Sequence, residues 1–213
     1  TREERERAIR EAGWNTFLLR SADVSIDLLT DSGTTAMSTD QWAAYDGACP
    51  TPATSDAYLK FVGAMREIYG YEYILPTHQG RAAEQIQSEV LIRPGQFVPG
   101  NMYFTTTKAH QELAGGRFVD VINDAAHDPD DESPFKGNVD LAKLERVIAE
   151  AGPSRIPYMA LQCNVNMAGG QPVSLDNVRQ VSHLCRRHGI RLFLDATRAV
   201  ENAYFIKQRE PGH

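Results

Sequence analysis

The chain has 213 residues, of which 42% are hydrophobic, and a formal net charge of −6 at pH 7, so it is long and apolar enough for one large domain with a buried core. The mildly acidic, mixed charge argues against nucleic-acid and anionic-membrane partners, no apolar run approaches the roughly 20 residues that cross a bilayer, and no signal peptide is visible. Cys49, Cys163 and Cys185 lack CxxC spacing, so we expect free thiols in a reducing, cytoplasmic compartment and no metal site.

The first part of the chain is predicted to form helices separated by polar loops. Thr1 to Ala12 carries Glu and Arg at i,i+4 spacing, which is typical of a solvated helix. We expect a short strand at Val24 to Leu29, and then a polar loop from Thr30 to Thr35 whose hydroxyls and amides could line an active site. A plain turn has the same composition. A second helix is predicted from about Asp56 to Tyr69.

A strand, a glycine-containing turn and a helix then follow in close succession. Tyr71 to Leu75 is predicted to be a short strand, and a helical pattern resumes at Ala82 to Leu91. The turn between them contains Gly80, which lets a ligand approach the backbone. A helix start of this kind points free N–H groups at an anion, so we interpret it as a phosphate cradle. Many turns in α/β proteins look similar and bind nothing.

The segment around Phe104 is predicted to be another strand-to-helix junction. Thr105 or Thr106 is a plausible N-cap for a helix that continues to Leu113. Phe104 could stack on a planar cofactor ring, although an aromatic residue at such a position is more often part of the core. The acids, prolines and glycine between Asp124 and Asn138 are typical of an exposed loop.

The last part of the chain reads as strand, helix, strand. An amphipathic helix at Val139 to Ala151 precedes a buried strand at Pro157 to Cys163, and a further helix leads to a second strand at Ile190 to Asp195. Such a unit has parallel strands, so Asn166 and Asp195 are expected at the same edge of the sheet.

Asp195 is the central functional prediction. It ends an apolar strand, and in open α/β sheets ligands bind just beyond the carboxyl ends of the strands. The carboxylate therefore needs a positive partner. If that partner is a protonated pyridine nitrogen, the acid makes the ring an electron sink, as in pyridoxal phosphate enzymes. Arg198 could reach the same ligand. The alternative is that Asp195 is the N-cap of the next helix.

Six stretches of the chain resemble the β-eliminating lyases of the fold-type I pyridoxal phosphate class. They are Phe17–Ser21, Asp27–Thr34, Pro76–Arg81, Gly100–Thr107, Ala168–Ser174 and Glu201–Lys207. They follow the family's order along nearly the whole chain, and the segments at Asn101 and Asp195 are more similar to the phenol-lyase branch. The resemblance implies an α/β, aspartate aminotransferase-like large domain with a mostly parallel sheet flanked by helices, incomplete in this chain.

The resemblance also implies a pyridoxal 5'-phosphate site and a set of residues that form it. The residues implied to bind the cofactor are Asp195 at the pyridine nitrogen, Gln79 and Gly80 at the phosphate, Phe104 on the ring, Thr197 beside it, and Asn166 and Arg198 at the ring hydroxyl and substrate end. The residues implied to lie near the substrate are Thr30, Arg81 and Thr105.

By the same resemblance, residues 1–24 are an N-terminal arm with part of a small domain, and residues 25–213 are the N-terminal portion of the cofactor-binding domain. The lysine that carries the cofactor would lie beyond His213, so we expect a missing C-terminal half. The family forms active sites across a dimer interface, and we therefore expect a homodimer or homotetramer.

One loop departs from the phenol-lyase pattern. In the phenol-lyases this loop holds an acid, which serves a monovalent cation, and shortly after it a tyrosine, which protonates the leaving carbon. When residues are counted without gaps from Trp42 to Pro76, these two positions fall on Pro50 and Pro52. Breaking a C–C bond needs that general acid, whereas a thiolate or persulfide departs without it. A gapped alignment could restore an acid from Tyr45 or Tyr58.

This departure favours C–S bond cleavage of an S-substituted cysteine, giving pyruvate, ammonia and a thiol or persulfide. It resembles the cysteine and thiocysteine lyase domains of polyketide synthases, which would make the chain part of a larger polypeptide. The alternatives are a tyrosine phenol-lyase or tryptophanase, which cleave a C–C bond, and an inactive relative that serves as a scaffold or dimerisation module. A nucleotide-binding domain is disfavoured because GxGxxG and GxxxxGK[ST] patterns are absent.

Overall fold

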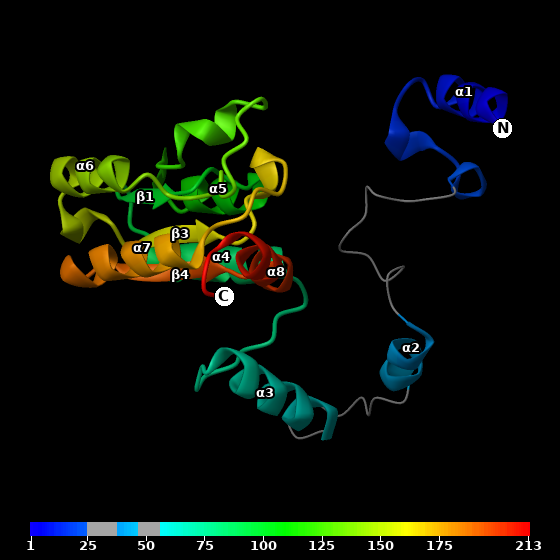
Figure 1. Cartoon of the computed structure of the whole chain (residues 1–213). Coiled ribbons are helices and arrows are strands. Elements are labelled where there is room, and N and C mark those ends of the chain that lie inside the picture. Colours follow the sequence, from blue (N-terminus) through cyan, green and yellow to red (C-terminus); the bar gives the residue numbers. More distant parts are fainter. Residues whose placement is uncertain (25–37, 47–55) are drawn as a thin grey trace. The chain divides into compact units, whose positions relative to one another are not determined.

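The computed structural model describes residues 1–24, 38–46 and 56–213 (Figure 1). The chain divides into two compact units, Thr1–Leu75 and Pro76–His213. The domain boundary predicted between residues 24 and 25 is a different division, and it stays a prediction. Most of the predicted strand at Val24 to Leu29, the loop at Thr30 to Thr35 and the loop that contains Pro50 and Pro52 lie outside the described residues.

The first unit contains helices and short helical turns. The elements in its described part are α1 (Arg2–Glu11), η1 (Thr16–Leu18), η2 (Ser21–Asp23), α2 (Thr39–Asp46) and α3 (Asp56–Tyr69). Both helices predicted for this part of the chain are confirmed. The hydroxyl of Thr1 accepts a bond from the backbone N–H of Glu4, whose side chain bonds back to the Thr1 backbone, so α1 begins with a capping box.

The strand predicted at Tyr71 to Leu75 is wrong. The segment has no regular structure, and Tyr71, Tyr73 and Leu75 are all exposed. A strand requires a hydrogen-bonded neighbour, and no strand in the described part of the chain pairs with this segment. The local pattern of aromatic and aliphatic residues favours extended backbone but cannot supply that neighbour.

The second unit contains a four-stranded sheet in the order β2-β1-β3-β4. Its strands are β1 (Phe97–Gly100), β2 (Arg117–Asp120), β3 (Tyr158–Gln162) and β4 (Arg191–Asp195), and every neighbouring pair is parallel. The predicted α/β class with a mostly parallel sheet is confirmed. The junction predicted around Phe104 implied a strand before it, but the bounds of β1 and the presence of β2 were not predicted. Each strand has only four residues, and β1 ends in Pro99 and Gly100, which are rare inside strands.

Five helices and three short helical turns accompany the sheet. They are α4 (Gly80–Leu91), α5 (Thr105–Leu113), η4 (Asp124–His127), α6 (Leu141–Ala151), η5 (Pro153–Arg155), η6 (Asn166–Ala168), α7 (Leu175–Arg187) and α8 (Ala199–Arg209). The N-cap of α5 is Phe104, so the prediction that Thr105 or Thr106 caps this helix is wrong. None of the helices in the described ranges has the length and apolar character that a bilayer crossing needs.

The two faces of the sheet pack against different helices. Met159 and Leu161 of β3 belong to a core that includes Leu144 of α6 and Val181 of α7. On the other face Tyr158 and Ala160 of β3 pack with Val98 of β1 and Ile92, the residue that ends α4. All five residues of β3 are buried, as expected for a central strand of a parallel sheet covered on both faces.

The segment from Asp124 to Asn138 is not exposed throughout, contrary to the prediction. Its end is buried, with Phe135 at 9% and Lys136 at 6% relative exposure. The reason is a close backbone approach at Gly137, whose N–H donates to the carbonyl of Pro172 at 3.1 Å. A Cβ on Gly137 would lie 2.6 Å from the carbonyl oxygen of Gln171, so only glycine fits there.

A buried amide joins β1 to β3 beyond their last backbone pair. The Nδ2 atom of Asn101 donates to the carbonyls of Gly137 at 3.0 Å and Gln162 at 3.1 Å, and its Oδ1 accepts from the Gln162 backbone N–H at 2.8 Å. The Nε2 atom of Gln162 in turn donates to the carbonyl of Met102 at 2.8 Å. Asn101 is completely buried, so water does not compete for the groups that form these bonds.

Substituting Asn101 with Ala should therefore destabilise the full-length protein by about 2–4 kcal/mol, because two carbonyls and one N–H would lose a buried partner. Urea unfolding followed by circular dichroism measures this loss. Gln85→Ala is the matched control, since its amide is exposed and donates to Glu89 on the same helix. Equal unfolding midpoints for the two variants would contradict the assigned role of Asn101.

Candidate functional site

The carboxyl ends of β3 and β4 lie side by side. Gln162, the last residue of β3, pairs in register with Asp195, the last residue of β4. The segments after the two strands are also joined, because the N–H of Cys163 donates to the Asp195 carbonyl at 3.0 Å and the N–H of Arg198 donates to the Cys163 carbonyl at 3.1 Å. Asp195 is thus fixed at the edge of the sheet where ligands of α/β proteins bind.

The side chain of Asp195 is held by Thr197. Its Oδ1 atom accepts from the backbone N–H of Thr197 at 3.1 Å and from the Thr197 hydroxyl at 2.6 Å. The alternative that Asp195 caps the next helix is wrong, because the N-cap of α8 is Arg198. Asp195 is half-buried rather than fully buried, since β4 lies at the edge of the described sheet.

A narrow cavity at this edge brings Asp195 together with Phe104. It is lined by Met102, Tyr103, Phe104, Thr107, Lys108, Gln111, Phe118, Ala160, Gln162, Phe193 and Asp195. Aromatic side chains and a carboxylate therefore line the same small space at this edge of the sheet.

Several of these lining residues were not predicted from the sequence. Lys108 places its Nζ atom 5.2 Å from the centre of the Tyr103 ring, and the Tyr103 ring meets the Phe118 ring edge-on at 6.4 Å. Gln162 could have been recognised from the sequence as a candidate site residue, because an amide at the carboxyl end of an otherwise apolar strand is unusual. The contact between Tyr103 and Phe118 joins two different elements, and no local pattern reveals it.

Three helices of the second unit begin without a side-chain cap. The N-cap residues Gln79 of α4, Phe104 of α5 and Arg198 of α8 make no side-chain hydrogen bond to the helix start. In contrast, Asp140 caps α6 and Ser174 caps α7 with their side chains. Uncapped starts present backbone N–H groups and the positive end of the helix dipole to an anion.

Hydrogen bonds from α5 to α4 hold two of these uncapped starts next to each other. The hydroxyls of Thr106 and Thr107 in the first turn of α5 donate to the carboxylate of Glu84 in α4, at 2.6 Å and 2.8 Å. Glu84 was not predicted as a site residue. At the start of α4, a Cβ added to Gly80 would meet no atom within 4 Å, so the space in front of this residue is open.

Three of the other predicted site residues lie in the described part of the chain and do not line the cavity. Asn166 begins the short turn η6 beyond β3, Arg81 is exposed on the first turn of α4, and Thr105 is exposed at the start of α5. Thr30 lies outside the described residues. Their roles stay predictions.

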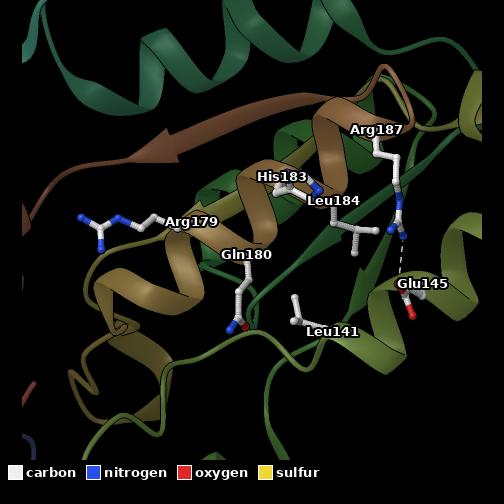
Figure 2. Close-up of a pocket in the computed structure, with 7 residues that line it drawn as sticks. All are labelled: Leu141, Glu145, Arg179, Gln180, His183, Leu184 and Arg187. Atoms are coloured by element: carbon white, nitrogen blue, oxygen red, sulfur yellow. Dashed lines mark hydrogen bonds and ion pairs between the residues drawn. The ribbon is translucent and has the colours of Figure 1, made fainter.

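A separate depression lies between α6 and α7, away from the predicted site residues. Figure 2 shows its lining residues: Leu141, Glu145, Arg179, Gln180, His183, Leu184 and Arg187. Across it, the Arg187 guanidinium pairs with the Glu145 carboxylate at 3.1 Å, and both side chains are more than half exposed. An exposed pair of this kind contributes little to stability.

The two cysteines among the described residues are buried free thiols. Burial, together with the nearby Asp195 carboxylate, raises the pKa of Cys163 to about 12. Burial alone raises the pKa of Cys185 to about 11. Both residues are therefore neutral packing groups at physiological pH rather than nucleophiles.

Comparison with known proteins shows a single family. A model of the family described as "Beta-eliminating lyase" matches residues 27–210. The chain is 62% identical over its full length to a tyrosine phenol-lyase of Symbiobacterium sp. (strain SC-1) and 60% identical to one of Nostoc punctiforme. It covers 46% of each of these relatives, so it spans less than half their length.

The fold is similar to that of solved pyridoxal phosphate enzymes. A PLP-bound C-S lyase from Staphylococcus hominis aligns with a TM-score of 0.52 over 73% of this chain and 38% of that structure. The sequence identity is only 11%, so this likeness concerns the fold alone. The predicted fold-type I architecture, incomplete in this chain, is confirmed.

The raised thiol pKa values predict that Cys163 and Cys185 resist alkylation in the native protein. With a pKa of about 12, only about one Cys163 thiol in ten thousand is ionised at pH 8. Iodoacetamide at pH 8, followed by mass spectrometry of peptides, should find both residues unmodified until urea is added. Raising the pH to 9 should leave this unchanged, because the thiols titrate far above it. Labelling of native Cys163 at the rate of free cysteine would contradict the assignment.

Proposed function

This chain belongs to the beta-eliminating lyase family, and from that premise we propose that it is the N-terminal part of a pyridoxal 5'-phosphate-dependent tyrosine phenol-lyase. Such an enzyme converts tyrosine to phenol, pyruvate and ammonia. The observation that carries the proposal is the 60–62% identity, along the entire chain, to relatives that bear this name. The C–S lyase reading rests on one loop and receives less support.

The chemistry of the carboxyl edge fits pyridoxal phosphate. Asp195 would hold the pyridine nitrogen, and Phe104, which lines the same cavity, would cover the ring. When bound, the cofactor stores the electron pair that is released as the substrate loses its α-proton. Asp195 keeps the ring nitrogen protonated, and the two bonds from Thr197 to its Oδ1 hold the carboxylate in one orientation.

The phosphate would lie at the uncapped start of α4, beside Gln79 and Gly80. The open space in front of Gly80 and the absence of a side-chain cap on α4 support this assignment. Backbone N–H groups at a helix start bind phosphate well, because they donate hydrogen bonds to it and the positive end of the helix dipole attracts its negative charge.

The other predicted residues complete the proposed site. Asn166 and Arg198 would contact the ring hydroxyl and the substrate, and Thr30, Arg81 and Thr105 would lie near the substrate. A lysine beyond this chain would carry the cofactor, and we propose a homodimer or homotetramer as the assembly. The named relatives are tyrosine phenol-lyases, so the link to a polyketide synthase has no support among them.

The C–S lyase remains a second candidate because of Pro50 and Pro52. Proline can supply neither the carboxylate nor the phenol that the ungapped count assigns to these positions. A C–C lyase without a general acid would be slow, whereas departure of a thiolate needs no acid. The choice between a tyrosine phenol-lyase and a C–S lyase therefore depends on whether the protein turns over tyrosine or an S-substituted cysteine.

Incubating the full-length protein separately with tyrosine, tryptophan and S-methylcysteine, and measuring pyruvate, distinguishes the readings. We expect turnover of tyrosine with equimolar phenol. Pyruvate from S-methylcysteine but not from tyrosine would replace the proposal with the C–S lyase. A protein that neither absorbs in the visible after addition of pyridoxal phosphate nor releases pyruvate would be the inactive scaffold.

Asp195→Asn should lower kcat/KM for tyrosine roughly 100-fold or more, because an amide cannot hold a proton on the pyridine nitrogen. The Asn side chain can still accept both bonds from Thr197, so the fold should persist. Asp176→Asn is the matched control, since Asp176 is exposed on α7 and bonds to Gln180. Equal kcat/KM values for the two variants would remove Asp195 from the site.

A further inference from the structure

A single carboxylate links the two helix starts that the proposed function assigns to the cofactor. The Oε2 atom of Glu84 accepts from the Thr106 hydroxyl at 2.6 Å, and its Oε1 atom accepts from the Thr107 hydroxyl at 2.8 Å. Both bonds are short and charge-assisted, which makes them stronger than bonds between neutral groups. Both are also partly buried, so water competes weakly for either group.

Glu84 and its two hydroxyl donors lie close to the starts of α4 and α5. Glu84 follows Gln79 and Gly80 by about one turn of α4, and its two donors follow Phe104 within the first turn of α5. A displacement of α4 along α5 would therefore break both bonds. It would also change the distance between the proposed phosphate site and the ring that covers the cofactor.

The contact between the two helices stays polar further along. Ser88 follows Glu84 by one turn, Gln111 follows Thr107 by one turn, and their relative exposures are only 2% and 1%. Gln111 donates to the Tyr158 hydroxyl at 3.4 Å, and burial raises the pKa of Tyr158, which keeps this hydroxyl neutral. Beyond them the contact becomes apolar at Ile92.

Directional bonds fix a helix pair more specifically than apolar packing does. Apolar side chains tolerate sliding of one helix on another, whereas a buried carboxylate with two hydroxyl donors is satisfied in only a narrow range of positions. The polar part of the contact lies at the site end of both helices, and the apolar part lies at the far end. The helices are thus held most tightly where the cofactor would bind.

We propose that Glu84 is a positioning residue that fixes the phosphate-binding start of α4 against the ring-covering start of α5 through Thr106 and Thr107. The proposal rests on the proposed function. It assigns Glu84 no contact with the cofactor or substrate. Its removal loosens the cofactor site while leaving Asp195 and Phe104 in place.

The test measures the Kd of pyridoxal phosphate for the full-length apoprotein, by visible absorbance and by circular dichroism of the bound cofactor. Glu84→Ala should raise the Kd about tenfold or more, and Thr106→Val or Thr107→Val about fivefold each. Glu89→Ala is the control, because Glu89 is exposed on the same helix and accepts from Gln85, one turn before it. Its Kd should equal that of the unaltered protein.

Two further variants separate positioning from a general loss of stability. Glu84→Gln keeps an oxygen for Thr107 and a polar group opposite Thr106, so its Kd should stay within about threefold of the unaltered value. The double variant of Glu84→Ala with Thr106→Val should bind no more weakly than Glu84→Ala alone, because both changes break the same bond. Additive losses, or a Gln variant as weak as the Ala variant, would contradict positioning through these bonds.

The outcomes also separate this inference from the proposed function. An unaltered protein that fails to bind pyridoxal phosphate would overturn the proposed function and this inference with it. An unaltered protein that binds the cofactor, with a Glu84→Ala variant that binds equally well, would overturn only the role of Glu84. If Glu84→Ala does not fold, the near-isosteric Thr106→Val and Thr107→Val variants decide, and unchanged Kd values in both would reject the proposal.

Discussion

The hydrogen bonds between Asn101 and Gln162 are the constraint on which the carboxyl edge of the sheet depends. They continue the pairing of β1 with β3 past the point where backbone bonds end. Gln162 also holds the carbonyl of Met102, just before Phe104, and pairs in register with Asp195. Gln162 therefore connects the segment that follows β1 to the end of β4. A shift of Gln162 would separate Phe104 from the Asp195 carboxylate.

The helices of the second unit differ in whether a side chain caps their start. The Asp140 side chain accepts from a first-turn N–H of α6 and the Ser174 side chain from one of α7, whereas α4, α5 and α8 begin without such a cap. Water can satisfy the first N–H groups of an exposed helix start, and an anion that replaces this water gains from the helix dipole. In the proposed function, the phosphate of the cofactor takes the place of a side-chain cap at the start of α4.

Sequence reasoning predicted those parts of the fold and site that local pattern determines. Asp195 at the end of an apolar strand and Phe104 at a helix start follow from residue order alone, and both line one cavity. The strand expected at Tyr71 to Leu75 failed because pairing depends on a partner elsewhere in the chain. Glu84 escaped prediction for a related reason, since its donors lie 22 and 23 residues away. The predicted substrate contacts of Thr30, Arg81, Thr105 and Asn166 stay predictions.

The central claim is that Asp195 keeps a pyridine nitrogen protonated at the edge of this sheet. Nitrogen NMR of the full-length protein, loaded with pyridoxal phosphate labelled at its ring nitrogen, observes that proton directly. The account predicts the chemical shift of a protonated pyridine at neutral pH, and that of an unprotonated pyridine in Asp195→Asn. An unprotonated ring in the unaltered protein, or a protonated ring that persists in the variant, would contradict it.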